Sequence, residues 1–174
     1  MNRAITAMLA CATLLAGCAT PTSYEAMVPS SVDTARRHAQ SVGISVTGGQ
    51  ETDAAGKPQI SDDAFRQALT EAINRSRTFS RVVQGSGGDY VLTVALFGLD
   101  QPSFGFAFTV KMEAGWTLRR ASGGAPVWQE SIRSEFTATT SDAFAAVTRL
   151  RMATEGAARV NIAQGLAKIS RLNL

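Results

Sequence analysis

Alternating apolar and polar residues predict that the folded body begins with a strand near residue 41. Val42, Ile44 and Val46 alternate with smaller or polar residues, which is the period of a strand with one buried face. After a polar loop, Ser61 is a favourable N-cap residue, and the two aspartates that follow it would stabilise the first turn of a helix. The apolar positions of this helix recur at spacings of three and four, as they do when one face packs against a sheet. They are Phe65, Leu69, Ala72 and Ile73.

Two further strands are predicted between this helix and residue 97. The first is a short β-branched segment at 80–84, and a glycine-rich turn at 85–88 separates it from residues 90–97. The second segment carries apolar residues on both faces, as does a central strand that is covered on both sides. We expect helices to cover one of these sides, and the sequence does not identify the cover of the other.

A long hairpin is predicted from the next two apolar segments. From Phe104 to Leu118, apolar residues occupy alternate positions, and charged, polar or small residues lie between them. At about 3.3 Å per residue such a strand would be about 50 Å long, so we expect a bend or bulge near Gly115. A turn at 122–124 then leads into residues 127–139, which form the second strand of the hairpin.

The last element is predicted to be a helix from Ser141, its N-cap residue, to about Ser170. An apolar stripe along it would face the sheet, and charged residues four apart would lie on its solvated side. Gly156 and Gly165 interrupt the helix. They indicate either close approach to the sheet or a kink, and the sequence leaves both alternatives open.

The order strand, helix, four strands, helix predicts an α+β fold. We expect a two-layer sandwich in which a sheet of about five mostly antiparallel strands carries two helices on one face. Residues 41–174 have the size of a single domain that buries its own core.

The first 17 residues have the composition of a signal peptide. Met1–Arg3 is a short basic start, and the apolar or small run Ala4–Leu15 is shorter than the about 20 residues that span a bilayer. The segment Leu14-Leu15-Ala16-Gly17-Cys18 resembles the lipobox of bacterial lipoproteins. This resemblance implies cleavage between Gly17 and Cys18 and a diacylglycerol on the Cys18 thiol, which would anchor the chain to a membrane.

The cysteines and the segment after them follow from this hypothesis. Cys11 is a poorer match to a cleavage site, so it is expected to leave with the signal peptide, and the remaining 157 of the 174 residues then hold no free thiol. Residues 18–40 contain Pro21, Pro29 and many serines and threonines, a composition typical of a flexible tether. We therefore predict a lipidated N-terminus and tether at 18–40.

Short motifs in the body are similar to those of small proteobacterial envelope lipoproteins. They are Ala68-Leu69, Phe79-Ser80-Arg81-Val82-Val83, Gly88-Asp89-Tyr90-Val91-Leu92 and Arg159-Val160-Asn161-Ile162. The groups concerned are the lipopolysaccharide-assembly, YajG-like and transporter-auxiliary lipoproteins. The resemblance implies a binding or assembly role, and Ala19 in place of aspartate after the anchor implies the periplasmic side of the outer membrane.

Candidate catalytic, cofactor and metal groups are few. The only histidine, His38, has no evident partner in the expected tether, and we interpret it as a solvated linker residue. The acidic pair Glu51 and Asp53 lacks further ligands at a metal-binding spacing. The turn at 85–88 enters a strand, whereas a phosphate-binding loop enters a helix. We expect neither an enzyme nor a bound cofactor or metal ion.

Charge adds little to this picture. The net charge of +3 comes from 17 basic and 14 acidic residues scattered along the chain, with no basic stripe or motif for nucleic-acid binding. No nucleic-acid partner is expected.

One side-chain cluster of the body has functional potential. Phe104, Phe106 and Phe108 would share one face of the long strand, with small residues between them. They are either core residues or an apolar face for a partner or ligand, and the sequence leaves both open. We therefore predict a non-enzymatic envelope lipoprotein with a protein partner. The alternative is a carrier of lipid or a small apolar ligand that uses the aromatic face.

Overall fold

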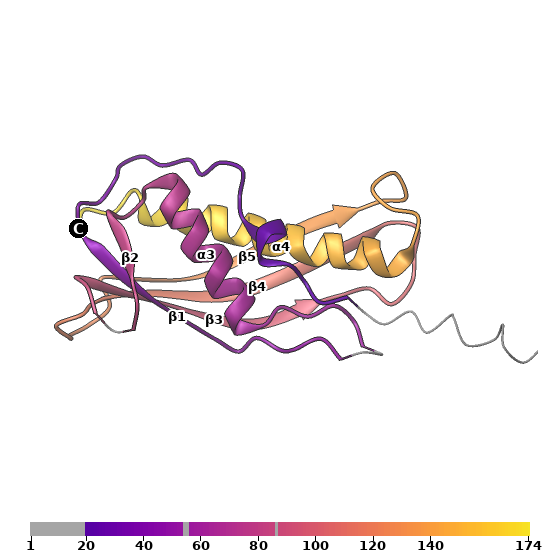
Figure 1. Ribbon diagram of the computed structural model, residues 1–174, viewed down its shortest axis with the longest axis horizontal. Helices are drawn as coiled ribbons and strands as arrows, with labels where there is room; N and C mark the ends of the chain where they lie inside the picture. The colour runs from indigo at the N-terminus through magenta and orange to yellow at the C-terminus, as the bar shows by residue number, and fades with distance from the viewer. Residues whose placement is uncertain (1–19, 54–55, 86) are drawn as a thin grey trace, which may run out of the picture.

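A five-stranded sheet with helices on one face forms the protein (Figure 1). The computed structural model describes residues 20–53, 56–85 and 87–174. The elements in chain order are α2 (Tyr24–Met27), β1 (Ser41–Thr47), α3 (Asp62–Ser76), β2 (Arg81–Val83), β3 (Tyr90–Asp100), β4 (Phe108–Arg120), β5 (Trp128–Ala138) and α4 (Ala146–Ile169). The predicted α+β class is confirmed.

The sheet has the strand order β2-β1-β3-β4-β5 and is mixed. β1 runs parallel to both β2 and β3, whereas β3, β4 and β5 pair antiparallel. The register aligns the apolar positions of neighbouring strands on one face, for example Val42 with Tyr90 and Val94 with Trp116. These four side chains are buried under α3 and α4, and they form the centre of the core.

The opposite face of the sheet is open in the part of the chain that the structure describes. The central strand β3 was expected to be covered on both sides, but Val91, Thr93 and Ala95 on its outer face are only half-buried. Mostly polar and charged side chains of β4 and β5 continue this outer face. We refer to it as the open face.

Helix α3 forms as its local signals predict. The Ser61 hydroxyl accepts a hydrogen bond from the Ala64 amide at 3.2 Å, and Arg77 ends the helix with a left-handed φ of 56°. The predicted apolar residues Phe65, Leu69, Ala72 and Ile73 are all buried. Capping and periodicity agree here, so the sequence determined this element.

Helix α4 begins at Ala146, five residues after the predicted N-cap Ser141. The reason is that a turn forms where the sequence predicts the first turn of the helix. The Asp142 carboxylate accepts hydrogen bonds from both the amide and the hydroxyl of Thr139, at 2.7 and 2.9 Å, and this closes a turn before the helix. The prediction of a helix start at Ser141 is therefore wrong.

Both glycines of α4 allow close approach to the sheet. A Cβ atom on Gly165 would lie 2.5 Å from the buried Trp116 ring, and one on Gly156 would overlap the Phe136 ring. Close approach, and not a kink, explains the two glycines.

The long strand predicted from Phe104 is shorter and carries no bulge. β4 begins at Phe108, and its pairing with β5 continues without interruption past Gly115. The irregularity lies instead in β3, between Leu96 and Gly98, where Phe97 bulges and its ring covers Gly115. The predicted bulge near Gly115 is thus on the neighbouring strand.

The predicted tether is packed in the part that the structure describes. Residues 20–40 run along the helical layer, and α2 contacts both α3 and α4. Met27 is fully buried in the core, and His38 is buried, with its Nε2 atom 3.0 Å from the carbonyl oxygen of Ile169. The expectations of a flexible tether and a solvated His38 are wrong over these residues. Long-range contacts that composition does not reveal hold the segment.

Candidate functional site

The predicted aromatic face divides into buried and exposed parts. Phe108 is 3% exposed, whereas Phe104 and Phe106 are 89% and 87% exposed. Gly105 has a φ of 145°, so the chain bends between the two phenylalanines and does not continue the strand. The core alternative therefore holds for Phe108. Phe104 and Phe106 lie on the surface, where a partner or ligand face stays a prediction.

A third exposed aromatic residue joins them. Phe144, in the loop between β5 and α4, is 97% exposed. The sequence pattern did not reveal this residue, because position 144 falls inside the predicted helix; the available signal was a phenylalanine two residues after Ser141-Asp142. We call Phe104, Phe106 and Phe144 the aromatic tip. Figure 1 shows that both loops lie at the same end of the molecule, opposite the C-terminus.

Arg149 connects the two loops of the aromatic tip. Its guanidinium donates to the carbonyl oxygens of Ala143 and Phe144, at 3.0 and 2.6 Å, and to that of Gly105 at 3.4 Å. The side chain is buried, with its guanidinium carbon 5.3 Å from the centre of the Phe108 ring. The hydrogen bonds from this one buried charged group to carbonyls of both loops hold the two loops together.

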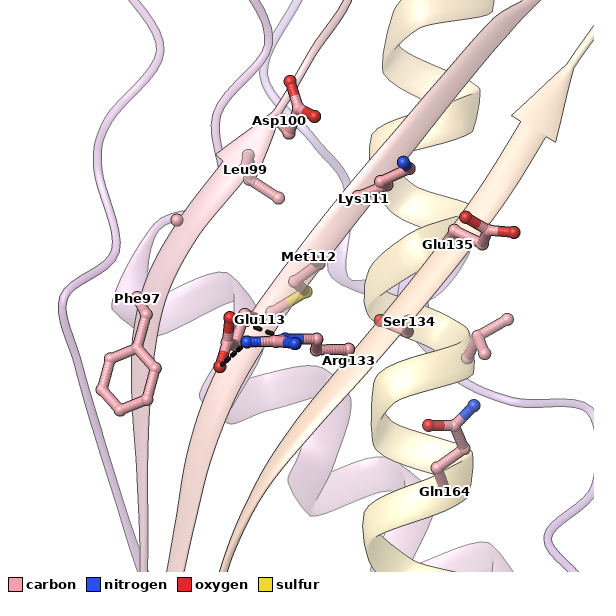
Figure 2. A pocket seen from close by; sticks show the side chains of 12 residues that line it. Phe97, Leu99, Asp100, Lys111, Met112, Glu113, Arg133, Ser134, Glu135 and Gln164 are labelled. Atoms are coloured by element: carbon pink, nitrogen blue, oxygen red, sulfur yellow. Dashed lines mark hydrogen bonds and ion pairs between the residues drawn. The ribbon is translucent and has the colours of Figure 1, made fainter.

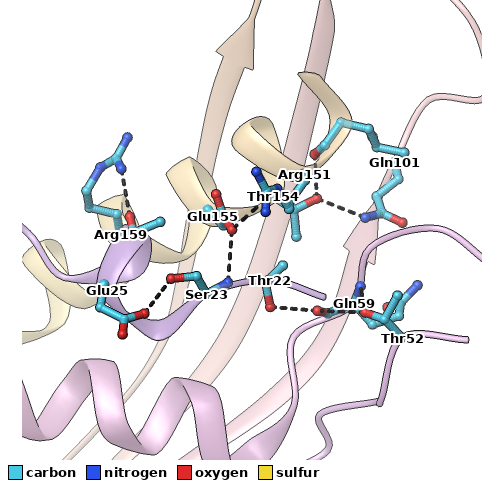
Figure 3. A network of polar contacts seen from close by, with 12 residues as sticks. Thr22, Ser23, Glu25, Thr52, Gln59, Gln101, Arg151, Thr154, Glu155 and Arg159 are labelled. Carbon is cyan, nitrogen blue, oxygen red and sulfur yellow. Dashed lines mark hydrogen bonds and ion pairs between the residues drawn. The ribbon is translucent and has the colours of Figure 1, made fainter. Parts of the chain in front are cut away.

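The N-terminal segment is bound to the middle of α4 (Figure 3). The Ser23 amide donates to the Glu155 carboxylate at 2.9 Å, and Arg159 donates to the Ala26 carbonyl at 2.7 Å. The Thr22 hydroxyl donates to the Gln59 carbonyl at 2.7 Å. We call these three contacts the N-terminal clamp.

Glu155 is the buried charge of this clamp. Burial raises the pKa of its carboxyl group, and the hydrogen bond from Ser23 and the nearby Arg151 and Arg159 oppose that rise. The side chain holds the backbone amide of Ser23 against the helix, which is a structural role.

Gln101 connects the loop that carries Phe104 and Phe106 to the turn of α4 that binds the N-terminal segment. Its side-chain amide donates to the Pro58 carbonyl at 2.7 Å and to the Thr154 hydroxyl at 2.9 Å. Lys57 donates in turn to the Gln101 carbonyl at 2.9 Å. Since Thr154 and Glu155 are adjacent on α4, the start of the tip loop and the N-terminal segment meet on one turn of that helix (Figure 3).

A hollow of about 870 Å³ lies beside the bulge of β3 (Figure 2). Phe97, 64% exposed, and Leu99 line one side, and charged residues of β4 and β5 line the other. The Glu113 carboxylate accepts from Arg133 at 3.0 Å and from the Ser131 hydroxyl at 2.6 Å. These two donors hold the pKa of Glu113 below its ordinary value, the serine having the larger effect.

The hollow presents an aromatic ring next to fixed charges of both signs. A surface ion pair such as Glu113–Arg133 contributes little to stability, so its effect lies in the charges that it presents. Lys111, Asp100 and Glu135 add further charges along the rim. Such a mixture suits a protein surface better than a purely apolar ligand.

Gly17 and Cys18, the predicted cleavage and lipidation site, lie outside the described residues, as does the whole predicted signal peptide. Within the described ranges, no three His, Cys, Asp or Glu side chains cluster as metal ligands would. No helix in that same part of the chain is both long and apolar enough to cross a membrane.

No protein-family model and no curated protein matches the sequence. Solved structures share the fold at low sequence identity. A Xanthomonas campestris protein of the DUF330 family is 13% identical, with a TM-score of 0.58 over 87% of this chain and 91% of its own. A protein from Caulobacter crescentus, described as a candidate lipoprotein, is 18% identical, with a TM-score of 0.51 over 74% and 87%.

A third similar structure is an oligomer. A PelC dodecamer from Paraburkholderia phytofirmans is 16% identical, with a TM-score of 0.52 over 82% of this chain and 95% of its own. At these identities the likeness establishes the fold, and the function must be argued from the residues of this chain.

Proposed function

We propose that this chain is a non-enzymatic lipoprotein of the bacterial envelope that holds a protein partner close to a membrane. Cleavage after Gly17 and lipidation of Cys18 would anchor it in the outer membrane, facing the periplasm. The observation that carries the proposal is the N-terminal clamp, which ties the chain to α4 only five residues after Cys18. An anchor attached so closely keeps the body at the membrane surface.

The hollow on the open face is the proposed partner site. Phe97 supplies an exposed aromatic anchor of the kind that dominates binding energy at protein interfaces. The Glu113–Arg133 pair beside it would orient a partner that carries complementary charges. The partner is therefore expected to insert an apolar side chain next to Phe97.

The alternative function, a lipid or apolar-ligand carrier, has less support. Its binding groove was expected along the aromatic face of the long strand. Phe108, Val110 and Trp116 on that face are buried under α4, so among the described residues the helix already fills the place of a ligand. The hollow that remains on the open face is rimmed by charges, which an acyl chain would have to desolvate.

Site-specific photocrosslinking in cells tests the partner site. A photoreactive amino acid at Phe97 should give a discrete crosslinked protein, and the same amino acid at Val127, an exposed apolar residue directly before β5, should not. Arg133→Glu should reduce the Phe97 product, because it reverses a charge at the site. Equal products at both positions, or none at Phe97, would refute the proposed site.

Lipidation is tested separately. Growth with an isotope-labelled fatty acid should label the wild-type protein and leave Cys18→Ser unlabelled. Label that persists in Cys18→Ser would contradict the anchor, whatever the outcome of the crosslinking.

A further inference from the structure

The aromatic tip exposes three phenylalanine side chains that nothing in the described part of the fold covers. Phe104, Phe106 and Phe144 are each at least 87% exposed, and Arg149 holds their two loops together. Contiguous exposed apolar groups of this size mark a surface for a partner or a membrane. Because the loops are fixed, little conformational entropy would be lost when such a surface is occupied.

The two segments that carry the tip hold no ionised side chain of their own. Residues 101–107 read Gln-Pro-Ser-Phe-Gly-Phe-Ala, and residues 143–148 read Ala-Phe-Ala-Ala-Val-Thr. Charges border them: Asp142 precedes the second segment, and the Lys57 ammonium lies 3.3 Å from the Ser103 hydroxyl oxygen of the first. Arg149, between the loops, is buried and turned to backbone carbonyls. The rims of protein interfaces are polar, whereas the boundary between the headgroups and acyl chains of a bilayer accepts exposed phenylalanines and tolerates charges beside them.

The anchor position brings the tip to the membrane. Ser23 is bound to Glu155, which lies nine residues into α4, so it is about 14 Å along the helix from the end that carries the tip. Five residues separate Ser23 from Cys18, and an extended chain of that length reaches at most about 18 Å. A lipid on Cys18 can therefore lie level with the tip when the connecting chain runs toward that end of the body.

We propose that the aromatic tip is a second membrane contact, which inserts its phenylalanines into the interfacial layer beside the lipid anchor. The inference rests on the proposed lipidation of Cys18. With the anchor and the tip both in the bilayer, the body has two attachment points at one end. Its long axis then stands away from the membrane, and the open face is directed sideways and accessible to a partner.

Tryptophan scanning in vesicles tests this inference on the full-length processed protein. Phe106→Trp and Phe144→Trp place a fluorophore in the tip, and Phe97→Trp on the open face is the matched control. The proteins are reconstituted into phosphatidylethanolamine and phosphatidylglycerol vesicles, with or without bromine on the acyl chains near the interface. The wild-type protein supplies the background from its two native tryptophans.

The added tryptophan at position 106 or 144 should lose emission in the brominated vesicles, and the one at Phe97 should not. Loss at neither tip position would overturn the inference. A blue-shifted tip emission without loss in brominated vesicles would also overturn it, because the tip would then be buried in a second protein copy. The mass of the reconstituted protein reports acylation at Cys18: an acylated protein whose tip is not quenched leaves the anchor intact, whereas an unacylated protein refutes both proposals.

Discussion

Gly165→Ala should destabilise this protein, although alanine is the better helix former. The new Cβ atom would lie 2.5 Å from the Trp116 ring, which is fully buried. The ring cannot slide away freely, because its Nε1 atom donates a 2.9 Å hydrogen bond to the buried Asn161. The added Cβ atom and the Trp116 indole would therefore overlap.

The magnitude follows from three opposing terms. Replacing glycine by alanine inside a helix favours folding by about 0.5 to 1 kcal/mol. Overpacking a filled core costs about 1 to 3 kcal/mol, and weakening the indole hydrogen bond costs up to about 1 kcal/mol more. The net expectation is a loss of about 0.5 to 3 kcal/mol in the free energy of unfolding, with the steric term deciding the sign.

Denaturant unfolding followed by tryptophan fluorescence and by circular dichroism measures this loss. Gly98→Ala is the matched control, because its added Cβ would meet no atom within 4 Å and its φ is not in the left-handed region. That control should stay within about 0.5 kcal/mol of the wild type. If Gly165→Ala proved as stable as the wild type or more so, close packing of α4 on Trp116 would be refuted as the reason for the glycine.

Three further predictions concern the core, the clamp and the tip. Asn161→Leu should lower the free energy of unfolding by about 2 to 4 kcal/mol, because it leaves the buried indole donor of Trp116 unpaired; calorimetry would show a lowered midpoint. Burial raises the pKa of Glu155, so the folded chain holds that proton more tightly than the unfolded chain, and stability falls as the pH rises from 4.5 through the raised pKa. Glu155→Gln keeps the oxygen that accepts from the N-terminal segment but does not titrate, so the decrease in unfolding midpoint from pH 4.5 to neutral pH should become smaller. An unchanged decrease would contradict the raised pKa of Glu155 as its cause. Phe106→Asp should leave the free energy of unfolding within about 0.5 kcal/mol of the wild type. Phe108→Asp should abolish cooperative unfolding, because of these two residues only Phe108 is in the core.

The sequence predicted those elements whose signals are local and agree with each other. In α3 the cap at Ser61, the apolar period and the acidic first turn all specify one helix, and the structure has it at those residues. The β4–β5 hairpin was likewise recognisable, because alternation over so many positions admits one buried face.

The aromatic tip could be predicted only in part, because phenylalanines of one alternating pattern lie partly in the core and partly on the surface. Phe104, Phe106 and Phe108 continue one alternating pattern, yet Gly105 turns the chain and leaves the first two exposed. The turn that brings Phe144 to the same place depends on Asp142 bonding backward to Thr139, although a Ser-Asp pair is equally suited to start a helix. Periodicity cannot decide between these outcomes, since both keep the apolar spacing.

The N-terminal clamp was not predictable, and it changes what the proposed anchor does. Proline, serine and threonine between residues 20 and 40 indicate a tether only if no distant partner exists. The clamp partners are Gln59, Glu155 and Arg159, and the last two lie more than 130 residues away. A free tether of that length would let the body tumble over the membrane. The clamp leaves at most about 18 Å of chain between Cys18 and the folded body. Under the proposed lipidation, the body is therefore held close to the membrane surface. The proposed tip contact would fix which end faces the bilayer, so that a partner would meet the open face at a restricted height above it.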